Sequence, residues 1–286
     1  MEPKLLGSEW YFDDTNIDTL IAYARQHYPD GLLPREEHPW YADYGSAPFA
    51  RPIEQLGIRK IPRSEWPERI RRMEQLRARV SDHCDFPCRD QGRTNFCWAN
   101  GPCAALDMAR RVAGLPFEET SAASVACKIT GFRNIGGWGI DAIRYLAQYG
   151  GVSSRLWPND AIDRRYDTPE ADADRRRRQV VEWWDVPPRD FDWLATLCLL
   201  GIPCSVGYIR WAHEVTACDL VEVSPGRFGI RIRNSWGKWG SQNTHGQWGF
   251  AVLAESEATP DECLAVRVAT AYGTGHPEPG HIIAAV

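Results

Sequence analysis

The chain has 286 residues, of which 43% are hydrophobic and 11% aromatic, and its formal net charge is −5. This aromatic content excludes a disordered chain, and the length allows one large core or two packed lobes. Without the basic excess of a nucleic-acid-binding protein, we expect no nucleic-acid partner. No apolar run approaches the ~20 residues that cross a bilayer, and the first residues lack a secretory signal. We therefore expect no membrane partner.

The first 60 residues are rich in proline and aromatic side chains. Residues 16–25 fit a short amphipathic helix, but prolines at 29, 34, 39, 48 and 52 exclude long regular elements after it. We interpret residues 1–60 as an N-terminal extended arm that wraps the main domain, and residues 61–286 as that domain.

The main domain changes from helical to strand-like patterns along its length. The expected helices cover about 65–80, 97–112 and 140–149, and the expected strands cover 204–209, 215–223 and 228–233. Ser224-Pro225-Gly226 is the expected turn between the last two strands. This order predicts an α+β fold, with a helical lobe at about 85–185 and a β lobe at about 186–270.

A charged segment covers residues 171–184 and includes four consecutive arginines, Arg175 to Arg178. One interpretation is a patch that binds anions or an acidic partner. Because aspartates at 172 and 174 partly cancel the positive charge, we favour a solvated helix face.

The nine cysteines form no dense framework, and six of them lie in apolar or helical contexts that indicate small core residues. Cys84 and Cys88 are spaced like half of a metal site or a small disulfide. No second His/Cys pair with zinc-site spacing accompanies them, so we expect no metal and no cofactor. A reducing compartment fits this pattern.

Cys97 falls at the expected start of a helix, in the segment Gln91-Gly92-Arg93-Thr94-Asn95-Phe96-Cys97-Trp98-Ala99. The positive end of the helix dipole favours the thiolate, which is the nucleophilic form of cysteine. Gln91, six residues earlier and before a glycine turn, is placed to direct its amide at the same spot. With the Cys97 backbone N–H it would form an oxyanion hole. The alternative is a buried structural cysteine beside a core tryptophan.

Two later segments supply a candidate base and a residue to orient it. His213 opens an apolar strand, and Asn234 ends the inward row of another strand, two residues before Trp236. A buried amide needs a polar partner, and an imidazole N–H would serve. A regular hairpin would set His213 opposite Lys238, so a bulge or a looser turn is required to bring His213 and Asn234 together.

Together these segments resemble the papain-like family of cysteine peptidases over about residues 61–255. The family pattern matches Gln91, Gly92, Cys97, Trp98 and Ala99, then Asn134 to Trp138, then His213 and Val215, then Asn234 to Gly237. The resemblance implies a two-lobed fold with the active-site cleft between the lobes. It implies peptide-bond hydrolysis by Cys97, His213 and Asn234, with Gln91 stabilising the oxyanion. Substrate would contact Gly136, Gly137, Asn95, Trp138 and Trp236.

Several features depart from the family pattern. Thr94 and Asn134 stand where the family has a pair of bridged cysteines, and Asn95 replaces a glycine that leaves room for substrate. Residues 1–60 lack the helical signature of the family's inhibitory propeptide, so we expect a structural arm rather than an autoinhibitor. His245 lies in an expanded segment near the cleft, and we interpret it as a surface loop residue.

These departures leave other functions open. A catalytically idle or narrow-specificity scaffold would serve as a structural or assembly component of a larger complex, for example a virus particle. A thiol-dependent amidase or acyl transferase would keep the nucleophile but change the reaction. The excess of arginine over lysine indicates a GC-rich genome, typical of a bacterium or its viruses, and we expect a cytoplasmic or virion-associated protein that acts on a peptide or protein.

Overall fold

The computed structural model describes residues 3–41, 50–53 and 57–269. Within these residues a nine-stranded sheet runs through the molecule in the order β1-β2-β8-β7-β6-β5-β9-β4-β3. The strands are β1 Lys4–Leu6, β2 Glu9–Phe12, β3 Ala50–Pro52, β4 Val180–Val186, β5 Cys204–Tyr208, β6 His213–Ser224, β7 Arg227–Arg233, β8 Phe250–Ala254 and β9 Glu262–Ala269.

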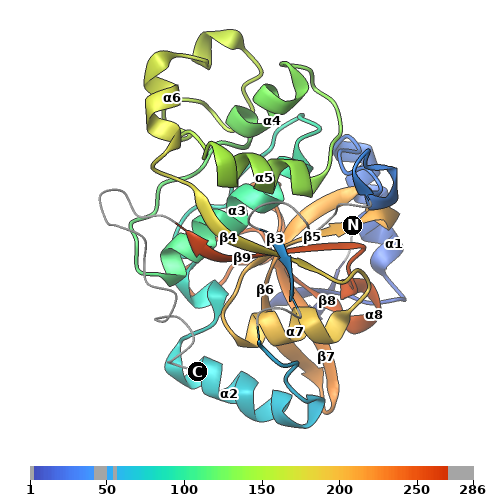
Figure 1. Ribbon diagram of the computed structural model, residues 1–286. Coiled ribbons are helices and arrows are strands. Elements are labelled where there is room, and N and C mark those ends of the chain that lie inside the picture. Colours follow the sequence, from blue (N-terminus) through green and yellow to red (C-terminus); the bar gives the residue numbers. More distant parts are fainter. Residues whose placement is uncertain (1–2, 42–49, 54–56, 270–286) are drawn as a thin grey trace.

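The helices gather on opposite sides of the sheet. They are α1 Ile17–His27, α2 Trp66–Leu76, α3 Cys97–Val112, α4 Ala122–Thr130, α5 Gly139–Gln148, α6 Pro169–Arg175, α7 Phe191–Leu199 and α8 Glu255–Ala258. Figure 1 shows α3, α4, α5 and α6 together above the central strands, with α2 and α7 below them. Each side has its own hydrophobic core, and α3 lies at the junction, where it packs against β5, β6 and β9.

The helices and strands expected from the sequence patterns are present. The helix from Cys97 ends at Val112 as predicted, and the hairpin of β6 and β7 turns at Gly226, whose φ of 72° suits a residue without a side chain. The fold is α+β, as predicted. Six strands of the sheet, β1, β2, β3, β4, β8 and β9, were not predicted.

The N-terminal residues are more regular than an extended arm. β1 and β2 form a hairpin, and β2 adds to the edge of the sheet in parallel with β8. The predicted helix is present as α1, which buries Ile17, Leu20 and Ile21 in the core of the β side. After α1, residues 30–33 cross between the two sides of the molecule, where they contact Cys97 of α3 and Ala212, the residue before β6.

The arginine cluster is not the solvated helix face that we expected. Arg175 and Arg178 are 4% and 0% exposed, whereas Arg176 and Arg177 face solvent. The buried Arg178 forms ion pairs with Asp174 and Glu118. Charges that are buried in proteins need such partners. The two buried arginines, Arg175 and Arg178, therefore hold α6 to the helical side of the molecule.

Candidate active site

Cys97 is the first residue of α3 and is fully buried. Its Sγ lies against the backbone just before β6, where the thiol donates to Ala212 O at 3.9 Å. Ala212 adopts the left-handed conformation, with φ of 47°, immediately before β6. The helix start and the strand start that were predicted separately therefore meet at the thiol.

His213 and Asn234 are joined side chain to side chain. His213 Nε2 lies 2.7 Å from Asn234 Oδ1, and both residues are buried. The Trp236 ring packs 4.5 Å from the imidazole, measured between ring centres, and shields this contact from water. Two register shifts interrupt the pairing of β6 and β7. They provide the irregularity that is required to bring His213 and Asn234 together. The hydrogen bonds of the described residues include none between the imidazole and Sγ.

Gln91 is held next to this pair by Ser235. The Ser235 hydroxyl donates to Gln91 Oε1 at 2.6 Å, and the Gln91 backbone N–H donates to Ser235 O at 2.9 Å. Gln91 Nε2 donates one hydrogen to Thr94 O at 3.0 Å. The amide is thereby fixed in orientation, and its second hydrogen has no acceptor among the hydrogen bonds of the described residues.

The two titratable groups of the site are neutral in this structure. Burial raises the pKa of the Cys97 thiol to about 12, and the nearby Glu214 carboxyl adds to the rise. Burial lowers the pKa of His213 to about 4, against a smaller opposing effect of its bond to Asn234. A thiol and a neutral imidazole are therefore the stable pair at neutral pH while the site is closed to water.

The lowered pKa of His213 predicts a loss of stability in acid. The unfolded chain takes up a proton at this residue near pH 6.5, whereas the folded chain does so only near pH 4. Neutral His213 therefore makes its full contribution to the free energy of unfolding above pH 6.5. As the pH falls to 4, this contribution is lost and the free energy of unfolding decreases by about 3 kcal/mol. Urea unfolding of wild type and His213→Gln between pH 7 and 4 measures it. Equal pH dependence of the two proteins would contradict the assignment.

The cleft beside Cys97 is filled by residues 30–33 of the chain itself. The backbone N–H groups of Gly31 and Leu32 donate to Ala212 O at 3.2 and 3.0 Å. A methyl group on Gly31 would lie only 2.7 Å from Sγ and 2.5 Å from Asn95 O. Only a glycine therefore fits between the thiol and the loop that precedes it.

The residues predicted to contact substrate lie against residues 28–34 in this structure. Gly137 N–H donates to Gly31 O at 2.9 Å, and Leu33 N–H donates to Gly137 O at 3.0 Å, so the two strands pair in parallel. Asn95 Nδ2 donates to Asp30 O at 2.9 Å. Three further contacts complete the set: Gly136 lies against Gly31 O, Trp138 Nε1 donates to Pro34 O at 2.8 Å, and Trp236 stacks on Tyr28 at 4.3 Å.

An amide bridge stands where the resembling family has a disulfide. Asn134 Oδ1 accepts the Asn95 backbone N–H at 2.7 Å, and Asn134 Nδ2 donates to Arg93 O at 3.3 Å. The side chain thus ties the loop before Cys97 to the Gly136-Gly137 segment without a covalent bond. All nine cysteines are free thiols. Cys84 and Cys88 therefore do not form the small disulfide that their spacing allowed.

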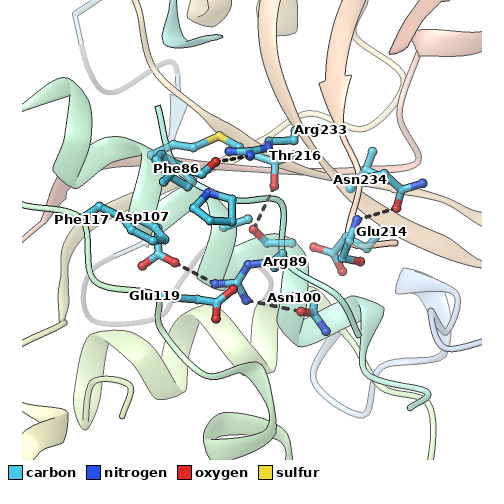
Figure 2. Close-up of a pocket in the computed structure, with 16 residues that line it drawn as sticks. Phe86, Arg89, Asn100, Asp107, Phe117, Glu119, Glu214, Thr216, Arg233 and Asn234 are labelled. Carbon is cyan, nitrogen blue, oxygen red and sulfur yellow. Dashed lines mark hydrogen bonds and ion pairs between the residues drawn. The ribbon is translucent and has the colours of Figure 1, made fainter. Parts of the chain in front are cut away.

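The buried side chain of Arg89 supports the loop that carries Gln91. Figure 2 shows Arg89 between Asp107 and Asn100 in a small cavity that Asn234 also lines. Arg89 Nη2 lies 2.7 Å from Asp107 Oδ2, and both side chains are almost fully buried. The carbonyl of Arg89 accepts the N–H of Gly237 at 3.1 Å, which links the loops that carry Gln91 and Asn234.

Replacing Arg89 should destabilise the whole fold. Arg89→Met leaves the Asp107 carboxylate buried without its cation, and breaking a buried pair in this way costs about 3–5 kcal/mol. The matched control is Arg111→Met, because Arg111 pairs with the half-exposed Asp85, and exposed pairs contribute about 0–1 kcal/mol. Denaturant unfolding compares the two variants. Equal losses of unfolding free energy in the two variants would show that the buried Arg89–Asp107 pair contributes no more to stability than the exposed pair.

The described residues hold no group of three or more His, Cys, Asp or Glu side chains arranged to bind a metal ion. None of the helices in the described ranges has the length and hydropathy to cross a membrane. His245 is exposed, and its Nε2 lies 2.8 Å from Asp82 O in the surface loop where we expected it.

Solved structures with the same fold are cysteine proteases. One is of the mite allergens Blo t 1 and Der p 1, with 16% identity, TM-score 0.58, and coverage of 90% of this chain and 86% of that one. The ragweed pollen allergen Amb a 11, a cysteine protease in its proform, has 15% identity, TM-score 0.57, and coverage of 91% and 82%. Procathepsin L2 from the larval midgut of Tenebrio molitor has 18% identity, TM-score 0.57, and coverage of 91% and 84%.

The comparisons define the fold class of the chain. No protein-family model matches the sequence, and no curated protein matches it. The structural similarities nevertheless cover most of the chain and most of the proteases it resembles. The fold is therefore the papain-like fold of cysteine proteases, in a divergent form.

Three residues with evident roles in the site were not predicted from the sequence. Gly31 and Tyr28 belong to the segment that covers the cleft, and no motif distinguishes them within a proline-rich stretch. Glu214 directly follows the candidate base and has its carboxyl fully buried. A charged residue near the start of an apolar strand is a signal that could have identified it.

Proposed function

We propose that the protein is a cysteine peptidase in which Cys97, His213, Asn234 and Gln91 carry out the reaction. The contact between His213 Nε2 and Asn234 Oδ1 at 2.7 Å, beside a thiol at a helix start, is the observation that carries the proposal. It fixes the imidazole by one nitrogen and leaves the other for the thiol proton. The papain-like fold and the position of Gln91 support the same assignment.

In this reaction His213 takes the proton of Cys97, and the thiolate attacks the carbonyl carbon of a peptide bond. Gln91 and the Cys97 backbone N–H stabilise the oxyanion that forms. The C–N bond then breaks as His213 returns its proton to the leaving amine. Water, deprotonated by the same imidazole, hydrolyses the thioester and restores the free thiol.

We further propose that residues 30–33 keep the peptidase latent. They exclude water from Cys97 and His213, and this burial is the main cause of the neutral thiol and imidazole. The segment is not held as a substrate. Its carbonyls at Asp30 and Gly31 accept from Asn95 and Gly137, and none accepts from Gln91 among the hydrogen bonds described.

The test uses an epoxysuccinyl thiol inhibitor and a fluorogenic peptide library on the full-length chain. Wild type is compared with Gly31→Val, which is designed to displace the covering segment, and with Cys97→Ala. We expect one adduct on Cys97 and peptide hydrolysis in the displaced variant, and neither with Cys97→Ala. Absence of labelling at neutral pH, in a Gly31→Val protein whose cleft is accessible to protease, would reject the proposal.

The filled cleft also favours a second candidate function, a papain-like scaffold that assembles into a larger complex. A scaffold has no need to expose the thiol, and the contacts of residues 30–33 close the site on both of its walls. The same experiment separates the two functions, because a scaffold would give no hydrolysis after displacement. Labelling without hydrolysis of any peptide would instead indicate an amidase or acyl transferase.

A further inference from the structure

The two donors of the proposed oxyanion hole come from different segments of the chain. Gln91 lies in the loop before α3, and Cys97 is the first residue of α3. A peptide unit is planar, so a side chain that holds a carbonyl also sets the direction of the N–H group of the next residue. The carbonyls of Asp90 and Phe96 therefore determine how the backbone is oriented at the two donors.

Asn100 holds the carbonyl that precedes Cys97. Its Nδ2 donates to Phe96 O at 2.9 Å, and the side chain is fully buried. The same carbonyl accepts the backbone N–H of Asn100, also at 2.9 Å. The Phe96–Cys97 peptide is thereby held by a side chain as well as by the first turn of the helix.

Asn159 holds the carbonyl that precedes Gln91. Its Nδ2 donates to Asp90 O at 2.9 Å, and the side chain is only 8% exposed. The N–H group of the same peptide unit, which belongs to Gln91, donates to Ser235 O at 2.9 Å. This peptide is therefore held at both of its polar atoms, and the backbone from which the Gln91 side chain extends keeps one orientation.

The two asparagines are joined to each other and share one cation. Asn159 Nδ2 also donates to Asn100 Oδ1 at 3.0 Å. Arg89 Nη1 lies 3.3 Å from the Oδ1 atom of each asparagine, and Figure 2 shows its contact with Asn100. Because both oxygens face the guanidinium, both NH₂ groups face the carbonyls, and neither amide can flip without losing these hydrogen bonds.

We propose that Asn100 and Asn159 are positioning residues that set the distance between the two donors of the oxyanion hole. The proposal rests on the peptidase function proposed above. Donors stabilise an oxyanion only when they lie about 2.7–3.1 Å from the place where its charge develops. Since each donor belongs to its own segment, their separation depends on what joins the segments, and the hydrogen-bonded asparagines join them. Neither asparagine lies in the part of the sequence that matches the family pattern.

The test separates oxyanion stabilisation from the reactivity of the thiol. Peptide hydrolysis passes through an oxyanion, whereas alkylation of Cys97 by iodoacetamide needs the thiolate but forms no oxyanion. Both rates are measured on full-length Gly31→Val that carries Asn100→Leu or Asn159→Leu, because leucine keeps the volume but cannot donate. We expect kcat to fall by about 10- to 100-fold, with KM and the alkylation rate close to those of the parent variant.

Asn243→Leu is the matched control. The Asn243 side chain also holds two carbonyls, those of Ser81 and Cys84 at 3.1 and 2.9 Å, but in a loop that carries neither donor. Its kcat should equal that of the parent. Where a leucine variant does not fold, the smaller alanine replaces it at the same position. An unchanged kcat in both asparagine variants, or an equal fall in the alkylation rate, would overturn the proposal.

A second measurement needs no catalysis and keeps the pair testable if no peptide is cleaved, the outcome that would reject the peptidase function itself. The backbone amide signals of Gln91 and Cys97 are compared by NMR in the wild-type chain and in the single variants Asn100→Leu and Asn159→Leu. Because the asparagines are joined, each variant should shift both signals, whereas Asn243→Leu shifts neither. Variants that each shift only the signal of their own peptide would show that the donors are held independently, and would refute the proposal.

Discussion

Gly31→Val should open the cleft and expose Cys97. The added side chain meets Asn95 O and Cys97 Sγ at distances no real contact allows. Asn95 lies in the loop just before α3, and Cys97 is the first residue of that helix. Over-packing of this kind costs about 1–3 kcal/mol, which the chain avoids by releasing residues 30–33. The fraction of open chain then rises by about 5- to 150-fold. The rate of epoxysuccinyl labelling of Cys97 reports that fraction and should rise by the same factor.

Glu36→Val is the matched control for this change. Residue 36 lies shortly after residues 30–33, but it is exposed in the short 3-10 helix Arg35–Glu37 and does not line the cleft. We expect its labelling rate to equal that of wild type. If Gly31→Val and Glu36→Val label at the wild-type rate while both remain folded, residues 30–33 do not control access to the thiol.

The parts of the fold that could be predicted are those set by local pattern. The helix from Cys97 follows from an apolar period and ends before Gly114 and Pro116, and the β6–β7 hairpin follows from alternation around Gly226. Strand β4 could not be found in this way. Its sequence Val180–Val186 follows a charged helix, and a run that is buried among other strands lacks the alternation that reveals a half-exposed one.

The candidate site likewise has a part that local sequence patterns predict and a part that they do not. Cys97, His213 and Asn234 each lie at the end of a predictable element, so their meeting depends only on how those elements pack. The filled cleft depends on Gly31, which is brought to Ala212 by contacts between residues far apart in the chain. The sequence around Gly31 lacks a helical propeptide signature, and we expected a structural arm. The inhibition that we propose for it depends on backbone hydrogen bonds, which any sequence with a glycine at that point can form.

Loss of the imidazole should be the most damaging change once the cleft is open. In the Gly31→Val background, His213→Ala removes the group that takes the thiol proton and later gives it to the leaving amine, and we expect kcat/KM to fall by about 10²–10⁴-fold. Asn234→Ala should cost less, because the imidazole remains and loses only its 2.7 Å anchor while Trp236 still packs against it.

His245→Ala provides the matched control, since His245 is an exposed loop residue whose ring lies beside Asp82 O. Its peptide hydrolysis should equal that of the parent variant. The three variants should lose different amounts of kcat/KM, because they remove a general base, its orienting residue and an unrelated histidine. The loss should decrease in that order. If Asn234→Ala were as damaging as His213→Ala with both proteins folded, the amide would contribute more than orientation. If His213→Ala retained full activity, another group would have to deprotonate Cys97, and the proposed mechanism would fail at its first step.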